Sequence, residues 1–301
     1  MKPPIGQLVT EQQNPRTIHI DEQSTEGILH MINREDRLVP AAVEACIPHI
    51  AAAVDLIVER FAQGGRLLYV GAGSSGRLGI LDAAECPPTY GTDPQQVVGL
   101  IAGGQRAIQS AVEGAEDNVS LGRSDLLAAQ IRSNDTLVGI AASGRTPYVI
   151  GAMMEAREQG AAVVGISNNP GSEMGSYADV MIEAVTGPEV VLGSTRMKAG
   201  TSQKMILNML TTASMIRSGK VYRNLMIDMQ PTNEKLVNRA KRLIMLATDA
   251  NEQTVERVYV EAGGHMKTAI VMILLDVAAE EATQLLAQTN GNIGKAVQRI
   301  T

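Results

Sequence analysis

The sequence predicts an α/β fold, with a parallel sheet in the first part of the chain and helices alone in the last part. Up to Pro231, short apolar runs alternate with segments of helical periodicity, a pattern typical of parallel strands joined by helices. After Pro231 the apolar residues recur at helical spacing only. The chain has 301 residues, 45% hydrophobic and 19% charged, which is enough to build a sizeable core. The predicted strands are 67–70, 97–102, 136–141, 162–166 and 180–183.

The composition argues against nucleic-acid binding, a metal or cofactor, and membrane contact. The net charge is −6, no basic run occurs, and the chain has no Trp and one Phe, so nucleic acid is not an expected partner. Neither Cys46 nor Cys86 belongs to a C-x-x-C pair or to a cluster with metal spacing, so no metal or cofactor is expected. Residues 1–13 lack the apolar core of a signal peptide, and no apolar run has the length of a membrane span. We therefore expect a cytoplasmic protein without membrane contact.

The N-terminal region is predicted to be an arm followed by helices. Residues 1–24 are polar and contain three prolines, which indicates an arm rather than a core element. Helical spacing of apolar residues predicts helices over 25–33 and 41–62, separated by Pro40.

The first strand and the loop after it give the strongest local signal. A glycine loop that contains Ser74 and Ser75 follows this strand, and helical character begins at Arg77. This order directs backbone N–H groups and a helix N-terminus at an anion. The glycine spacing also fits G-x-G-x-x-G, but the next strand ends without the acidic residue that a ribose requires. The serine hydroxyls favour a phosphate monoester. A dinucleotide and a tight turn without ligand stay as alternatives.

The helix after this loop is predicted to end near Glu85. Pro87 disfavours helical geometry at the residue before it. At a helix C-terminus the macrodipole disfavours a carboxylate, so Glu85 there would retain a proton more easily. A solvated glutamate is the alternative interpretation.

An acidic cluster at 113–118 precedes the next long helix, which extends to about Ile131. Glu116 lies in this cluster, where the dipole of the helix favours an ionised carboxylate. Acidic residues at a helix start are also ordinary capping residues, so the cluster alone does not establish a function.

The loop after the third strand repeats the first arrangement. Ser143, Gly144 and Thr146 follow the strand, and Pro147 suits the first turn of a helix that runs through Met154. Two hydroxyl-rich loops that follow parallel strands converge at the carboxyl edge of a sheet. The sequence therefore predicts that both loops line one crevice.

A third candidate anion site lies in the run 187–204. Ser194 and Arg196, with two further cations, stand near the start of a long apolar helix that extends to about Ser218. A capped helix with solvated cations is the alternative.

The C-terminal part is predicted to be a compact helical appendage. We expect a structural role for His265, which lies in a Gly-Gly-His junction, and a place in the lining of a site is the alternative. The helices expected here span 234–248, 251–261, 267–277, 280–288 and 293–300.

Together these motifs resemble the sugar isomerase (SIS) fold and, within it, the family of bacterial N-acetylmuramic acid 6-phosphate etherases. The loop with Ser74 and the loop from Ser143 to Thr146 resemble the two phosphate loops of SIS domains. The run 187–204 resembles a signature that the glucokinase regulatory protein shares with the etherases. The resemblance covers nearly the whole chain, and the length suits an etherase with one SIS domain. Two further segments that resemble the etherase pattern are 10–15 and 82–88.

The resemblance implies a three-layer αβα fold with a five-stranded parallel sheet, a helical C-terminal part and a homodimeric assembly. The expected divisions are an N-terminal arm with helices at 1–57, an SIS domain at 58–221 and a helical part at 222–301. The implied catalytic residues are Glu85 and Glu116. The residues expected to bind an amino-sugar phosphate are Ser74, Ser75, Ser143, Gly144, Thr146, Ser194 and Arg196.

The implied reaction removes the D-lactyl ether of N-acetylmuramic acid 6-phosphate and yields N-acetylglucosamine 6-phosphate and D-lactate, as cell-wall sugar recycling requires. Opening the sugar to its aldehyde makes the proton on carbon 2 acidic, so that lactate can be eliminated from carbon 3 and water can add. We assign Glu116 as the base and Glu85 as the acid. A sugar-phosphate isomerase or a non-catalytic sugar-phosphate sensor would share the loops, but the presence of both acids favours an enzyme.

Overall fold

The structure, a computed structural model, describes residues 5–229, 231 and 233–298. These residues divide into two compact units. The first unit contains the described residues up to Ala84 together with Gln95–Thr211. The second contains Glu85–Pro94 and the described residues from Thr212 onward. The division of the chain at 57 and 221 stays a prediction.

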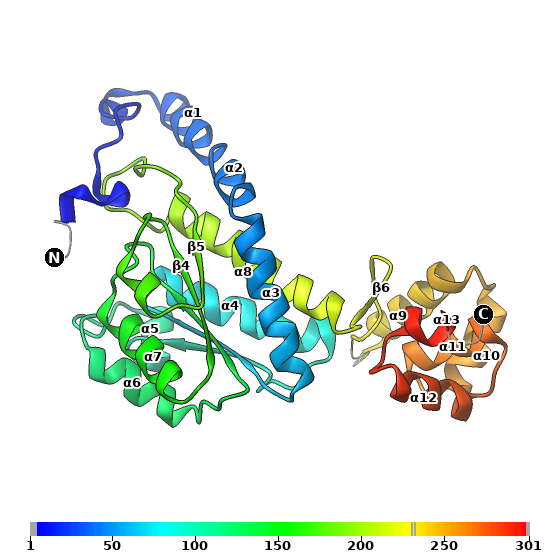
Figure 1. The fold of residues 1–301 in the computed structure, drawn as a ribbon. Coiled ribbons are helices and arrows are strands. Elements are labelled where there is room, and N and C mark those ends of the chain that lie inside the picture. Colours follow the sequence, from blue (N-terminus) through cyan, green and yellow to red (C-terminus); the bar gives the residue numbers. More distant parts are fainter. Residues whose placement is uncertain (1–4, 230, 232, 299–301) are drawn as a thin grey trace. The chain divides into compact units, whose positions relative to one another are not determined.

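A five-stranded parallel sheet forms the centre of the first unit (Figure 1). Its strand order is β2-β1-β3-β4-β5, and each neighbouring pair is parallel. Every residue of β1, β3 and β4 is buried, which explains why these strands read as continuous apolar runs. The predicted strands are confirmed as β1 (Leu67–Gly71), β2 (Val97–Ile101), β3 (Thr136–Ile140), β4 (Ala162–Ser167) and β5 (Val180–Glu183).

Helices surround this sheet, and two of them, α4 and α8, begin in the first unit and end in the second. Short 3-10 helices lie at η1 (Ile5–Gln7), η2 (Val9–Glu11), η3 (Ile20–Glu22) and η4 (Glu173–Ser176). The α-helices, in chain order, are α1 (Thr25–Asp36), α2 (Val39–Glu44), α3 (Ile47–Ala62), α4 (Gly73–Tyr90), α5 (Gly104–Gln109), α6 (Val119–Ala128), α7 (Pro147–Glu158) and α8 (Lys198–Arg217).

The sheet has helices on both faces, as the resemblance to three-layer SIS folds implies. On β3, the side chain of Ile140 points toward Gly79 of α4, whereas a Cβ on the neighbouring Gly139 would point at Met153 of α7. Adjacent strand residues point to opposite faces, so α4 and α7 lie on opposite sides of the sheet. α6 packs along α7 and thickens that layer.

The segment predicted as one helix, 41–62, is two helices. α2 carries Pro40 in its first turn, where a missing N–H removes no helical hydrogen bond. A second break, which the sequence reasoning missed, falls between Glu44 and Ile47, and Pro48 stands in the first turn of α3. Both prolines therefore begin helices instead of separating them.

Helix α4 is longer at both ends than predicted. It begins at Gly73, so the serine pair belongs to its first turn and not to a loop. It also continues through Pro87 and Pro88 to Tyr90, and the prediction that it ends near Glu85 is wrong. Each proline lacks the N–H that would bond one turn back, but this local loss does not end the helix. Glu85 therefore does not lie at the C-terminus of this helix.

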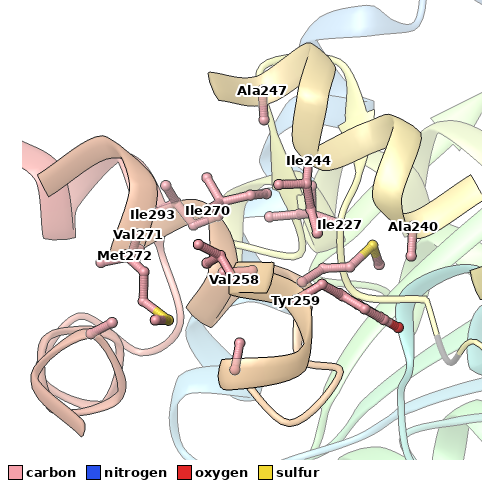
Figure 2. Close-up of a cluster of buried hydrophobic side chains, with 14 of the residues drawn as sticks. Ile227, Ala240, Ile244, Ala247, Val258, Tyr259, Ile270, Val271, Met272 and Ile293 are labelled. Carbon is pink, nitrogen blue, oxygen red and sulfur yellow. The ribbon is translucent and has the colours of Figure 1, made fainter. Parts of the chain in front are cut away.

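The second unit is a set of helices around its own hydrophobic core. The central helix is α11, which contacts α9, α10, α12 and α13 and buries Ile270 and Val271 among them (Figure 2). A two-stranded hairpin, β6 (Val221–Tyr222) with β7 (Leu225–Met226), precedes the helices and was not predicted. The predicted helices are confirmed as α9 (Glu234–Thr248), α10 (Glu252–Glu261), α11 (Met266–Leu275), α12 (Ala279–Gln288) and α13 (Ile293–Gln298). The predicted end of the last helix, at residue 300, lies outside the described residues.

Within the described part of the chain, no single helix has the length and apolar character needed to cross a membrane. Two bent helix pairs meet that length and composition only when joined: Thr25–Glu44 with Ile47–Ala62, and Glu252–Glu261 with Met266–Leu275.

Candidate active site

A cleft at the carboxyl ends of β1 and β3 contains most of the predicted site residues. From β1 the chain moves outward to β2, whereas from β3 it moves to β4 in the opposite direction. Such a reversal of strand order is where open parallel sheets bind ligands. The cleft has a volume of about 490 Å³. The predicted residues that line it are Ser74, Ser75, Ser143, Thr146 and Glu116.

The first wall of the cleft is the junction of β1 with α4. A Cβ on Gly71 would stand 2.6 Å from the backbone nitrogen of Gly76, so only glycine lets strand and helix approach this closely. The first turn of α4 places Ser74 half-buried and Ser75 buried. Ser75 Oγ donates to Gln203 Oε1 at 2.8 Å, which engages its hydroxyl hydrogen within the protein. Ser74 lines the cleft beside it.

The loop after β3 forms the second wall. Gly144 has a φ of +65°, and a Cβ there would stand 2.3 Å from the Cβ of Ser172. Gly144 is buried and shapes the loop without lining the cleft. Ser143 Oγ accepts a long hydrogen bond, 3.4 Å, from the backbone N–H of Arg145. Thr146 is the N-cap residue of α7, yet its side chain makes no capping hydrogen bond, so its hydroxyl can serve a ligand.

Glu116 is fixed at the cleft by its main chain. Its carbonyl oxygen accepts from the N–H of Tyr148 at 2.9 Å, in the first turn of α7. The Glu116 side chain is exposed and lines the cleft together with those of Asp117 and Glu11. Neither Asp117 nor Glu11 was predicted as a site residue, although they lie in the acidic cluster 113–118 and in the segment 10–15. Three carboxylates thus share a cleft with the hydroxyls.

The N-terminal arm supplies Glu11 because Asn169 holds it in place. Asn169 Oδ1 accepts from the N–H of Val9 at 2.6 Å. Asn169 Nδ2 donates to Thr10 Oγ1 at 3.0 Å and to the carbonyl of Ala142 at 2.9 Å. One amide therefore ties the arm to the loop after β3. The expectation that the arm stays out of the core is corrected, since its buried side chains include those of Thr10, Asn14 and Thr17.

The residues of the run 187–204 lie in different environments. Thr195 lines the cleft, whereas the predicted Ser194 does not. Arg196 is exposed and lines a neighbouring cleft. Lys198, one of the cations expected at an anion site, is fully buried and bonds to Glu35 at 2.7 Å. Lys198 therefore belongs to the interior, and the expectation for this cation is wrong.

The buried carboxylate of Glu35 joins the arm, α1 and α8. It accepts hydrogen bonds from Arg16 Nη2 at 2.9 Å, Asn14 Nδ2 at 2.8 Å and Lys198 Nζ at 2.7 Å. Hydrogen bonding to Arg16, against the opposing effect of burial and with the help of Lys198 and Asn14, lowers the pKa of Glu35 to about 2. This cluster fixes the start of α8 close to the cleft residue Thr195.

The buried side chain of Asp82 holds α4 against β1 and α8. It accepts from the hydroxyl of Tyr69 at 2.9 Å, from Asn208 Nδ2 at 2.8 Å and from Thr211 Oγ1 at 3.3 Å. Burial raises the pKa of Asp82, although these hydrogen bonds oppose the shift. These bonds fasten the first-unit parts of the two helices to each other and to β1.

Glu85, the other predicted catalytic residue, is exposed on α4 and is not among the described residues that line the cleft. It follows Ser74 by 11 positions, which is about 16 Å along a helix axis. The spacing of Ser74, Leu78, Leu81 and Glu85 places all four on one face of α4. Glu116 lines this cleft of the first unit, whereas Glu85 belongs to the second unit.

The remaining sequence candidates lie elsewhere. His265 is exposed at the start of α11, and its side chain makes no capping hydrogen bond. Cys46 and Cys86 are buried, and they do not form a disulfide bond. Among the residues that the structure describes, no group of three or more His, Cys, Asp or Glu side chains could hold a metal ion.

Two domain families match parts of the chain. The glucokinase regulatory protein N-terminal SIS domain matches residues 49–157, and the SIS domain matches residues 120–213. Between them, these ranges include both hydroxyl-rich loops and Glu116.

Relatives that match along the full length of the chain are described as N-acetylmuramic acid 6-phosphate etherases. The N-acetylmuramic acid 6-phosphate etherase of Photorhabdus laumondii is 56% identical over 300 residues, which is 100% of each chain. The etherase of Aeromonas hydrophila is 56% identical over 291 residues, 97% of this chain and 98% of that one. The etherase of a Geobacillus species is 55% identical over 294 residues, 98% of this chain and 100% of that one.

Proposed function

The chain belongs to the family of N-acetylmuramic acid 6-phosphate etherases, and we propose that it cleaves the ether in the cleft between β1 and β3. The activity is that of a carbon–oxygen lyase that releases D-lactate and leaves N-acetylglucosamine 6-phosphate. The observation that supports this cleft is the meeting of the first turn of α4, the loop after β3 and Glu116 at the reversal of strand order. Of the functions open from sequence, the isomerase and the sensor are set aside because the full-length relatives are etherases.

The phosphate of the substrate is proposed to bind between the first turn of α4 and the loop after β3. Ser74, Ser143 and Thr146 offer hydroxyl donors there, and Arg145 lines the same cleft. The N-termini of α4 and α7 add the positive ends of their dipoles. Ser75 then acts by holding Gln203, and not as a donor to phosphate.

Replacing a hydroxyl of the second loop is expected to weaken substrate binding. Ser143→Ala and Thr146→Ala should each raise the dissociation constant about tenfold or more, because a donor to a charged acceptor contributes roughly 1.5–3 kcal/mol. Isothermal titration with N-acetylglucosamine 6-phosphate measures the change without turnover. Ser176→Ala, an exposed serine of the same unit in η4, is the matched control. Unchanged affinity in both loop variants would contradict the phosphate assignment.

Glu116 is proposed to remove the proton from carbon 2 of the open-chain sugar. Its carboxylate is exposed in the cleft, and the hydrogen bond from the N–H of Tyr148 fixes its backbone. The electron pair of the broken C–H bond moves toward the aldehyde and then expels the lactyl oxygen from carbon 3. Water adds to carbon 3 of the resulting double bond, and a proton returns to carbon 2.

Glu85 is proposed as the acid that protonates the departing lactate and then activates water, and the etherase resemblance supports this role. Glu11 is the alternative source of that proton, because it is half-buried in the wall of the cleft that Glu116 lines. Each assignment supplies one base and one acid, as the reaction needs.

Isotope from water is expected in the sugar and not in lactate. If lactate leaves before water adds, turnover in heavy-oxygen water labels the hydroxyl on carbon 3 of N-acetylglucosamine 6-phosphate. Mass spectrometry of both products locates the label, and product incubated in the same water without enzyme corrects for spontaneous exchange. Label in the lactate would mean that water attacks the lactyl side, and the elimination route would be wrong.

A homodimeric assembly and a cytoplasmic location are further proposals that follow from the same resemblance. Val191 and Leu192, consecutive in the segment before α8, are 55% and 54% exposed and offer apolar surface that a second copy could cover. Sedimentation equilibrium measures the assembly directly.

A further inference from the structure

A second cleft lies over the first turns of α4 and α8. Its volume is about 470 Å³. Three cations, Arg77, Arg196 and Lys204, line it, and no carboxylate does so among the described residues. Leu78 and Leu81 add an apolar side. The cleft thus combines positive charge with hydrophobic surface.

The three cations have no acidic partner at salt-bridge distance among the described residues. In the same unit, by contrast, Lys198 is paired with Glu35. Buried Asp82 attracts Lys204 at longer range but accepts its hydrogen bonds from other side chains. Unpaired cations gathered around a cavity favour an anionic ligand.

The side chains of the three cations differ in how firmly the protein holds them. The Nε of Arg77 donates to the carbonyl of Ile108 at 3.0 Å, which fixes this half-buried side chain. Arg196 and Lys204 are exposed and make no such bond within the described structure. They are the two side chains that can turn toward a ligand.

This cationic cleft borders the candidate active site. Ser74 lines both clefts. Thr195 lines the active-site cleft and the next residue, Arg196, lines the cationic one, so their Cα atoms are about 3.8 Å apart. One ligand can therefore reach both.

The substrate of the proposed function has two anionic ends. Eight bonds separate the phosphorus from the carboxyl carbon of the lactyl group, a span of about 10 Å when extended. The hydroxyl-rich cleft suits the phosphate. The lactyl end carries a carboxylate next to a methyl group, which matches two mobile cations beside two leucines.

We propose that the cationic cleft binds the lactyl group, with Arg196 and Lys204 on its carboxylate and its methyl against Leu78 and Leu81. The inference rests on the proposed function and adds the group that distinguishes this substrate from other sugar phosphates. When the bond between carbon 3 and the lactyl oxygen breaks, its electron pair goes to that oxygen until a proton arrives. Two cations at the leaving group stabilise this added negative charge.

The test compares ligands with and without the lactyl group. In Arg196→Met and Lys204→Met, kcat/KM for N-acetylmuramic acid 6-phosphate should fall about 10- to 100-fold, as expected for a lost charge-assisted hydrogen bond. The dissociation constant of N-acetylglucosamine 6-phosphate should stay within about twofold. Arg37→Met, an exposed cation of the same unit outside both clefts, is the matched control. The methyl ester of the lactyl carboxylate should bind wild type and the two variants equally.

Each outcome of this comparison either supports or overturns the assignment of the lactyl group to the cationic cleft. Equal weakening of both sugars would mean that the cations serve the phosphate or attract anions in general, and would overturn the assignment. No change in either sugar would overturn it as well. If wild type released no lactate, the proposed function would fail, while selective weakening of N-acetylmuramic acid 6-phosphate binding in the variants would still support the lactyl site.

Discussion

Glu116→Gln should abolish exchange of the carbon 2 proton with solvent deuterium and lower lactate release by a factor of roughly 10²–10⁴. The amide keeps the size of the side chain but cannot accept the proton. Since the main-chain bond from Tyr148 fixes the position of residue 116, the substitution should leave the fold and the binding of N-acetylglucosamine 6-phosphate unchanged. Proton NMR in deuterium oxide follows the exchange, and a lactate assay follows release.

The same two measurements separate the candidate acids. Glu85→Gln should retain exchange at carbon 2 and lose lactate release, because proton removal precedes departure of the leaving group. If Glu11→Gln shows that behaviour and Glu85→Gln does not, the acid is the carboxylate of the N-terminal arm. Exchange lost in Glu85→Gln but kept in Glu116→Gln would reverse the assigned roles. Full lactate release by all three variants would refute the glutamate mechanism.

Glu35→Leu should reduce the free energy of unfolding by about 3–5 kcal/mol. The substitution leaves the fully buried ammonium of Lys198 without the carboxylate 2.7 Å away. Urea unfolding followed by circular dichroism measures the loss. The double variant Glu35→Leu/Lys198→Met removes both charges and should recover most of it, because apolar replacement of a buried pair is often neutral. A double variant as unstable as the single one would show that the stranded charge is not the cause.

The stability that Glu35 contributes should depend on pH in a defined direction. Its pKa is lowered to about 2 in the folded chain, so folding favours the ionised form. The contribution is fully present above the ordinary pKa of a glutamate and is lost as pH falls from about 5 toward 2, with a size of about 3 kcal/mol. Wild type should therefore lose stability relative to the double variant between pH 7 and pH 3. A constant difference would contradict the shift.

The sheet could be predicted from sequence because buried parallel strands leave continuous apolar runs with small residues at their ends. The ends of the helices were harder to predict from the sequence. Pro87 and Pro88 carry strong breaking preferences, yet α4 continues past them, since packing along a helix can outweigh a local penalty. The hairpin of β6 and β7 was not predicted because each strand has two residues, too few to show the alternation of apolar and polar residues.

The candidate site was predictable where a loop carries its own signature. Both hydroxyl loops and Glu116 reach one cleft, as the repeated arrangement of strand, loop and helix indicated. Contacts between residues that are far apart in the sequence leave no such local pattern. Lys198 looked like an anion-binding cation until its contact with Glu35, 163 residues away, was visible. Glu11 was missed for the same reason, since it reaches the cleft through the distant Asn169.

The bond between Val9 and Asn169 also sets the order in which this protein can mature during synthesis. The two residues are 160 positions apart, so the arm leaves the ribosome long before its anchor exists. Closing so large a loop costs conformational entropy, and contacts of this separation form slowly. The segment made first therefore cannot reach its place until Asn169 has been translated, and until then the cleft of the nascent chain stays open on that side.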